Sequence, residues 1–177
     1  MADELAIQEL VEKMSIERDS LLAGVQALDE PALTAVPVGK TGEEEWTVKQ
    51  QLAHLWQMER MYDAWIAACL REHEPDLNRV AFDPVPVPIA EANGHPVGEL
   101  LEGMNAERLR TLAIIEHLAP ADFDRGGSHA LFGRLSVMQW LRSFYRHDRM
   151  HRDQIAGKEP EYKPRFVSGV EPDQRGR

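Results

Sequence analysis

The most constraining feature of the sequence is the recurrence of apolar residues every three or four positions over four long segments. These segments span about residues 3–28, 48–72, 97–118 and 137–156. Such spacing places the apolar side chains on one face of an α-helix, so each segment can bury a stripe against the others. Sustained alternation of apolar and polar residues, which would indicate strands, does not occur. We therefore predict an all-α chain folded as a four-helix bundle with long connections.

Two of these helices have well-defined starts. Thr47 precedes the second helix and Ser136 precedes the fourth, and each is followed three residues later by a glutamine, Gln50 or Gln139. In this capping box the hydroxyl and the glutamine side chain satisfy backbone N–H groups that lack a partner within the helix. Gly157 follows the fourth segment and is expected to end it.

The connections between the helices are longer than ordinary bundle turns. They cover residues 29–46, 73–94 and 119–135. Loops of this length usually have a function, and we expect them to fold over one end of the bundle. The helices define one domain at residues 1–157, and a polar tail follows at 158–177. We expect the end of this tail, beyond Phe166, to be poorly ordered.

The charge balance excludes several kinds of partner. The chain has 30 acidic and 20 basic residues and a net charge of −10, so a phosphate backbone would repel it and no nucleic acid is expected. No run of 18 uncharged apolar residues occurs, and the N-terminus lacks the basic start of a signal peptide. The single cysteine, Cys69, cannot form an internal disulfide and is expected to be a buried small residue. We expect a soluble, cytoplasmic protein with no membrane partner.

Three histidines point to a metal site. His147 and His151 are four residues apart on the apolar side of the fourth helix, so their Cα atoms lie about 6 Å apart on one face. His54 lies at the edge of the apolar face of the second helix. Bundle cores commonly hold metals between facing helices. Three histidine ligands would leave one position open, the pattern of a catalytic site. The structural alternative is that these are core histidines bonded to carbonyl groups.

Charged residues on the apolar stripes also need an explanation. Asp148 lies beside the two late histidines, where it can orient a ligand imidazole or form an ion pair with Arg152. Arg18, Glu59 and Arg108 interrupt the apolar faces of the first three helices. A buried charge must be paired, so Glu59 is expected to bind an arginine. The alternative is that Arg108 remains unpaired and binds the carboxylate of a thiol cofactor or substrate.

Two sequence motifs resemble the DinB/YfiT-like superfamily. They are WTVKQQLAHL at residues 46–55 and HDRMHRDQI at residues 147–155. The resemblance extends to about Gly157 and rests on the order and spacing of both motifs. It implies a four-helix bundle, often a homodimer, in which three histidines hold a divalent metal. The matching positions here are His54, His147 and His151.

The resemblance also suggests a reaction. Some relatives are S-transferases or isomerases that use a low-molecular-weight thiol, and this favours thiol-dependent transfer to a small electrophile. The residues alone leave hydrolysis by an activated water equally open. A non-catalytic metal-binding or dimerisation module is the third alternative. Imidazole ligands accept zinc, nickel, iron or manganese, so the sequence does not select the metal.

Overall fold

A computed structural model of the chain describes residues 3–38, 40 and 42–169. The four predicted helices are present, and each end lies within two residues of its predicted position. The long helices are α1 (Glu4–Gln26), α3 (Val48–Arg71), α4 (Val97–Glu116) and α5 (Val137–Ile155). The shorter elements are α2 (Glu30–Thr34), four 3₁₀ helices (Gly42–Glu45, Leu77–Arg79, Ile89–Gly94 and Pro120–Asp124) and strands β1 (Gly126–His129) and β2 (Gly133–Ser136).

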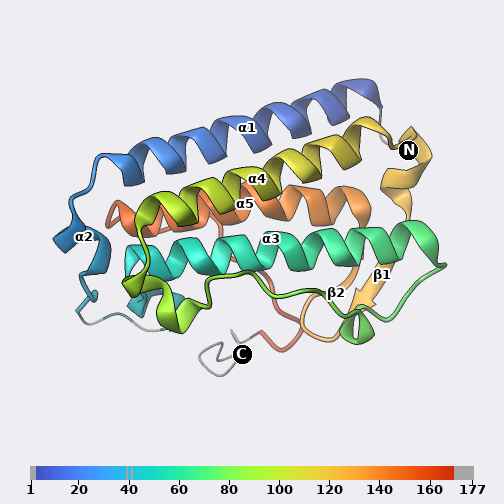
Figure 1. Cartoon of the computed structure of the whole chain (residues 1–177). Coiled ribbons are helices and arrows are strands. Elements are labelled where there is room, and N and C mark those ends of the chain that lie inside the picture. Colours follow the sequence, from blue (N-terminus) through green and yellow to red (C-terminus); the bar gives the residue numbers. More distant parts are fainter. Residues whose placement is uncertain (1–2, 39, 41, 170–177) are drawn as a thin grey trace.

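The bundle does not alternate up and down along the chain. In Figure 1, α3 and α4 run in the same direction, whereas α1 and α5 run the opposite way. Two parallel helices in sequence require the chain to travel back along the whole bundle between them. The connection from α3 to α4 does this, and its 3₁₀ helix Ile89–Gly94 packs against α3. The length of this connection therefore follows from the topology.

Our expectation that the long connections fold over one end of the bundle is wrong. The segment containing α2 lies at the end where α3 begins, and the β1–β2 hairpin lies at the end where α3 finishes (Figure 1). The hairpin itself was not predicted. Its strands have only four residues each and begin with Gly126 and Gly133, so they are too short for an alternating pattern. The backbone N–H of Ser128 donates to the carbonyl of Pro75, which joins the hairpin to the chain after α3.

The predicted helix caps are confirmed. Thr47 with Gln50 and Ser136 with Gln139 both form complete capping boxes. Gly157 has a φ of 69°, the left-handed conformation that ends α5 and that side chains disfavour. These local signals place the starts of α3 and α5, the two helices that hold the predicted metal ligands.

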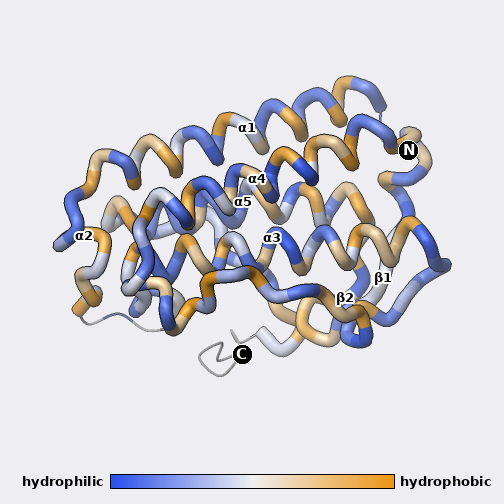
Figure 2. Tube along the Cα trace, in the orientation of Figure 1, coloured by the Kyte–Doolittle hydropathy of each residue, from blue (hydrophilic) through white to orange (hydrophobic). Residues whose placement is uncertain are grey.

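The apolar stripes face one another inside the bundle. On α1 the buried stripe is Leu10, Met14, Leu21 and Val25, interrupted only by the buried Arg18. Figure 2 shows apolar and polar residues alternating along each long helix with a helical period. The buried apolar residues form two clusters, one in each half of the bundle's length. The middle of the bundle, between the two clusters, is thus left for other side chains.

The packing of α4 against Trp56 of α3 requires a glycine at position 103. A Cβ atom at Gly103 would overlap the six-membered ring of Trp56, which is 6% exposed and cannot swing away. We expect Gly103→Ala to lower the free energy of unfolding by about 1–3 kcal/mol, measured by urea denaturation. Gly98→Ala in the same helix is the control, because nothing lies within 4 Å of its added Cβ. It should be neutral or stabilising by up to about 1 kcal/mol, and equal effects of both substitutions would contradict this packing.

The polar tail is part of the folded domain as far as residue 169. The Phe166 ring packs on Phe132 with centroids 5.5 Å apart, and the Val167 N–H donates to the Leu131 carbonyl at 2.7 Å. The chain after α5 therefore turns back over this helix and the hairpin loop. The rest of the tail, where we predicted disorder, lies outside the described residues.

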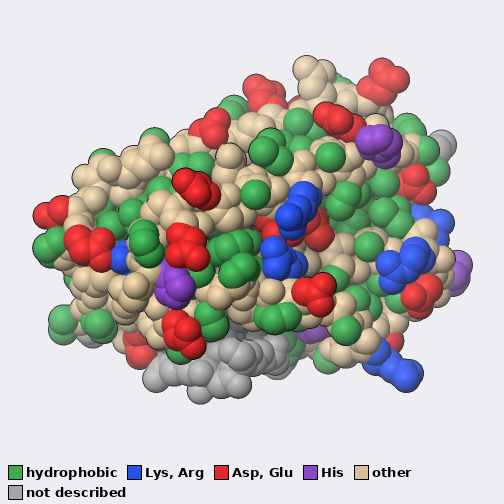
Figure 3. Space-filling model, in the orientation of Figure 1, with side chains coloured by type: hydrophobic (Ala, Val, Ile, Leu, Met, Phe, Trp, Pro, Cys, Tyr) green, Lys and Arg blue, Asp and Glu red, His purple; other side chains and the backbone are tan. Residues whose placement is uncertain are grey.

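The face shown in Figure 3 carries acidic, basic and apolar side chains intermingled. Among the described residues, no helix combines the length and apolar character needed to cross a bilayer.

Candidate metal centre

Three histidine side chains from two helices meet inside the bundle. His54 lies on α3, and His147 and His151 lie one turn apart on α5. The Nε2 atom of His147 is 3.2 Å from that of His54 and 3.0 Å from that of His151. The structure thus brings together the three histidines singled out from the sequence, and each offers a ring nitrogen to one shared centre.

The antiparallel packing of α3 and α5 produces this meeting. Near the start of α5, Trp140 packs on Trp65 late in α3; near the end of α5, His151 reaches Gln51 early in α3. Because residues four apart share a helix face, both α5 histidines point toward α3. His54 and His151 are buried, and His147 is half-buried.

A chain of hydrogen bonds fixes which nitrogen of His151 carries its hydrogen. The Gln51 amide nitrogen donates to the Trp46 carbonyl at 3.1 Å, which turns its oxygen toward His151. That oxygen can only accept, so the His151 Nδ1, 3.0 Å away, must donate. The Nε2 lone pair of the neutral ring is therefore directed at the shared centre. Such an outer hydrogen bond is the usual support of a histidine ligand.

Burial keeps the three rings neutral. Burial, followed by the neighbouring His147 and His151 rings, lowers the pKa of His54 well below its ordinary value. Burial likewise lowers the pKa of His151, with His147 adding to the effect. For His147, burial outweighs the attraction of Asp148 and lowers the pKa to about 4. Neutral imidazoles are the form that binds metals.

The donor set fits a divalent metal ion. Ring nitrogens that bind tetrahedral zinc at about 2.0–2.1 Å lie about 3.3–3.4 Å apart, close to the two nitrogen separations of 3.2 and 3.0 Å found here. Three neutral imidazoles suit zinc, nickel or iron, and three protein ligands leave room for one exchangeable ligand. Within the described part of the chain, no other group of three or more His, Cys, Asp or Glu side chains is arranged so that it could hold a metal ion.

A cavity of about 620 Å³ lies beside the histidines. His54 and His147 form part of its wall. Its apolar lining is Met58, Tyr62, Phe132, Leu135, Trp140, Pro164 and Phe166, and its polar lining is Gln139, Ser143, Arg146, Glu161, Tyr162, Lys163 and Arg165. The volume matches pockets that bind small molecules.

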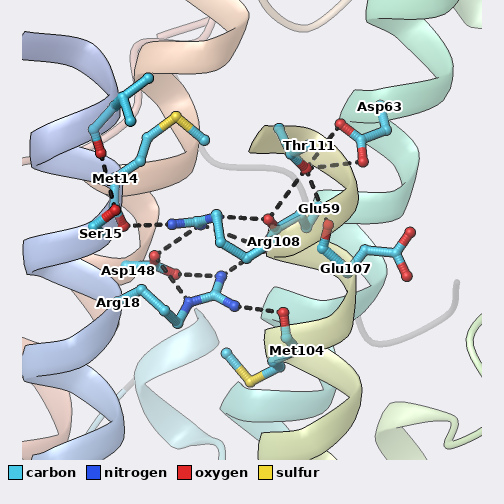
Figure 4. A network of polar contacts seen from close by, with 11 residues as sticks. Met14, Ser15, Arg18, Glu59, Asp63, Met104, Glu107, Arg108, Thr111 and Asp148 are labelled. Atoms are coloured by element: carbon cyan, nitrogen blue, oxygen red, sulfur yellow. Dashed lines mark hydrogen bonds and ion pairs between the residues drawn. The ribbon is translucent and has the colours of Figure 1, made fainter. Parts of the chain in front are cut away.

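Next to the histidines, four buried charged residues link all four long helices (Figure 4). They are Arg18 of α1, Glu59 of α3, Arg108 of α4 and Asp148 of α5, each at most 3% exposed. Arg18 binds Glu59 at 2.5 Å and Asp148 at 3.1 Å. Arg108 binds Glu59 at 2.6 Å and Asp148 at 2.9 Å. We call this group the four-helix ion network; it is neutral overall and lies between the two apolar clusters.

The network answers the questions that the sequence left open about these charges. The predicted pairing of Glu59 with an arginine is confirmed. Arg108 also donates to the Met14 carbonyl at 2.7 Å and is not among the described residues lining the 620 Å³ cavity. The geometry therefore fits the structural role of Arg108, and a role in cofactor binding stays a prediction without a contact to support it.

The predicted ion pair of Asp148 with Arg152 is wrong. Its carboxylate accepts hydrogen bonds from Arg18 and Arg108, whereas Arg152 pairs with Glu17 and Asp153. The helix register placed Asp148 correctly on the inward side, but only the packed structure reveals that two arginines from other helices reach it first. The amide oxygen of Gln51 accepts the hydrogen bond from His151, and an orienting role of Asp148 stays a prediction.

Asp63 makes the stability of the protein depend on pH. Burial, followed by the charge of Glu59, raises its pKa to about 8, and the charge of Glu107 adds to this rise. A hydrogen bond from Thr111 and the charge of Arg108 oppose the rise without cancelling it. In the unfolded chain this pKa is about 3.9. The folded state thus holds a proton that the unfolded chain releases, so this group's stabilisation falls as the pH rises from about 4 to 8.

Asn imitates the protonated side chain, so Asp63→Asn should unfold at higher urea than wild type at pH 8. The variant should also lose part of the wild-type decline in stability between pH 6 and pH 8. Asp19→Asn, at an exposed position of α1, is the control and should keep the wild-type decline. Identical pH profiles for Asp63→Asn and wild type would show that Asp63 is ionised in the folded protein.

The sequence did not reveal the residues that complete the site. Gln51 was read only as part of the motif, although its spacing of three from His54 places it on the same helix side. Nothing local in the sequence shows that the tail covers the face of α5 that carries Arg146. Cys69, in contrast, is buried as predicted, and burial raises the pKa of its thiol to about 11.

Comparison with known proteins supports the four-helix bundle fold. The uncharacterised protein YuaE of Bacillus subtilis (strain 168) is 25% identical over 131 residues, which cover 66% of this chain and 78% of YuaE. A solved structure, described as "YfiT from Bacillus subtilis is a probable metal-dependent hydrolase with an unusual four-helix bundle topology", superposes with a TM-score of 0.69. It is 17% identical, and the match covers 89% of this chain and 87% of YfiT. This likeness establishes the fold.

The family is established by a match to a family model. The family model of the DinB superfamily matches residues 5–155, which include all four long helices and the three histidines. The chain therefore belongs to the DinB superfamily.

Proposed function

We propose that this chain is a divalent-metal-dependent enzyme that converts a small molecule in the 620 Å³ cavity. The observation that carries the proposal is the convergence of three neutral ring nitrogens, from His54, His147 and His151, beside that cavity, whose wall includes His54 and His147. When bound, the ion supplies a Lewis-acid centre that lowers the pKa of a thiol or water ligand and provides a nucleophile at neutral pH.

The protein's own residues hold and orient the reactants. Gln51 keeps the His151 ring in one tautomer, and the buried position of His54 leaves it little freedom to turn. Met58 and Trp140 offer an apolar surface next to the histidines, which binds the apolar part of a substrate and excludes water from it. The histidines on one side of the cavity would thus hold the ion, and the apolar residues beside them would bind the substrate.

Thiol-dependent transfer to a small electrophile is the reaction we favour. Hydrolysis generally needs a carboxylate or imidazole to accept a proton beside the attacking water. Among the described cavity-lining residues, Glu161 is the one residue with a carboxylate. Its side chain is 72% exposed and pairs with Arg149. The three imidazoles are assigned to the metal. A free thiol has a pKa of about 8.5 and bulk water one of about 15.7, so a thiol depends less on such a base and a low-molecular-weight thiol fits the lining better than water.

Hydrolysis of a small molecule is the second candidate. The specific observation in its favour is the description of the structurally similar YfiT as a probable metal-dependent hydrolase. Both candidates use the same histidines and the same cavity, so they differ only in the nucleophile.

Turnover assays separate the two. The protein is loaded with zinc, nickel or manganese and given 1-chloro-2,4-dinitrobenzene with a panel of low-molecular-weight thiols, or 4-nitrophenyl esters without thiol. We expect thioether formation that exceeds the uncatalysed rate and is lost in His147→Ala/His151→Ala. Ester hydrolysis that needs no thiol would favour the second candidate. A metal-loaded protein inert in both assays would contradict the enzyme proposal and leave a metal-binding module.

A further inference from the structure

Arg146 is a half-buried cation in the wall of the cavity that holds the histidines. It precedes His147 on α5, and both line the cavity. Its guanidinium lies over the rings of Tyr162 and Tyr145, with distances of 5.5 and 5.8 Å to the ring centroids. Within the described part of the chain, no carboxylate forms an ion pair with it. Its charge is thus held in place by aromatic rings and remains available to a ligand.

Neighbouring arginines differ in this respect. One turn later on α5, Arg149 pairs with Glu161, and Arg152 pairs with Glu17. A partly desolvated charge without a counterion costs free energy, so a protein normally gives it a partner. The absence of a protein partner at Arg146 therefore indicates that the ligand supplies one.

The tail brings further positive charge to the same wall. Lys163 and Arg165 line the cavity. Glu161 is the one acidic residue among the described lining residues, and it is already paired with Arg149. Lys163 is partly neutralised by Glu159 at 2.6 Å. The cavity wall is thus positively charged in a chain whose net charge is −10.

We propose that the substrate of this cavity carries an anionic group, a carboxylate or a phosphate, which Arg146 binds with Arg165 as a second cation. This inference rests on the proposed function. A guanidinium forms paired, charge-assisted hydrogen bonds with either group. The apolar body of the same molecule packs on Trp140 and Phe166, which places its reactive part beside His147.

The tail is the element that makes this selection. Tyr162 holds Arg146 by its ring and accepts a hydrogen bond from it. Phe166 anchors the tail on Phe132. These tail residues follow the part of the chain that the family model matches, which ends at residue 155. The histidines and Arg146 thus lie within the family match, whereas the tail residues that hold Arg146 and add Arg165 to the site lie beyond it.

The test compares Arg146→Gln with Arg142→Gln in the full, zinc-loaded chain. Arg142 is the matched control, because it is half-buried on α5 one turn earlier and is not among the described cavity-lining residues. Isothermal titration calorimetry measures the binding of 3-phenylpropionate, phenyl phosphate and the neutral 3-phenylpropanamide. We expect wild type and Arg142→Gln to bind at least one anion about tenfold or more tightly than the amide, and Arg146→Gln to lose this preference. The preferred anion identifies the group as carboxylate or phosphate.

Two controls keep this outcome distinct from the metal proposal. Zinc content is measured on every sample, and each titration is repeated on metal-free protein. An anion preference that survives in Arg146→Gln but disappears without zinc belongs to the metal and overturns the role of Arg146, as does a wild type with no preference. A preference that depends on Arg146 in protein that binds no metal would support the anion site and contradict the proposed function. Arg146→Lys, which retains the charge, should keep part of the preference and serves if the glutamine variant does not fold.

Discussion

Arg108→Gln is expected to lower the free energy of unfolding by about 3–5 kcal/mol. The substitution leaves Glu59 and Asp148 with Arg18 alone, so one negative charge stays buried without a counterion. It also removes the donor to the Met14 carbonyl. For a chain of this length, such a loss lowers the melting temperature by roughly 6–20 °C, which differential scanning calorimetry measures directly.

Arg110→Gln, two residues later on α4, is the matched control. The Arg110 side chain is 65% exposed and lies 3.3 Å from Glu107, so its loss should cost no more than about 1 kcal/mol. If Arg108→Gln folded with wild-type stability but lost turnover, the arginine would instead bind a cofactor or substrate, the alternative that the sequence left open. The experiment therefore decides between the two roles.

Adding zinc is expected to stabilise the wild type and to leave His147→Ala/His151→Ala unchanged. A ligand that binds only the folded state, at a hundred times its dissociation constant, adds about 2.7 kcal/mol to the stability. This raises the melting temperature by roughly 5–11 °C in a protein of this size. The double variant keeps one imidazole, His54, which cannot hold the ion alone.

The control for this prediction is His117→Ala. This exposed histidine follows α4, and its Nδ1 lies 2.8 Å from the Ala113 carbonyl, so its loss should leave the zinc response intact. Equal zinc-induced shifts in wild type and double variant would mean that the ion binds elsewhere.

Local sequence signals were sufficient for the helices and for the histidine cluster. The helical period located the four long helices, and the capping boxes at Thr47 and Ser136 placed the starts of α3 and α5. Since residues four apart share a face, the pairing of His147 with His151 followed from spacing alone.

The contacts between distant parts of the chain were not predictable in the same way. The parallel direction of α3 and α4 depends on a long connection whose path has no local signal. The ion pairs of Asp148 depend on two arginines from other helices, Arg18 and Arg108. The half-buried position of Arg146 was not predictable, because a helix period describes one helix and not the tail folded over it. Side chains whose partners lie far away in sequence therefore needed the structure.

The central claim is that His54, His147 and His151 bind one divalent metal ion. Elemental mass spectrometry measures it most directly, on protein purified without a polyhistidine tag, beside His147→Ala/His151→Ala. We expect close to one equivalent of metal in the wild type and loss of it in the double variant. A wild type that stays free of metal after equilibration with zinc, nickel and manganese would contradict the claim, and the three histidines would then be buried core residues.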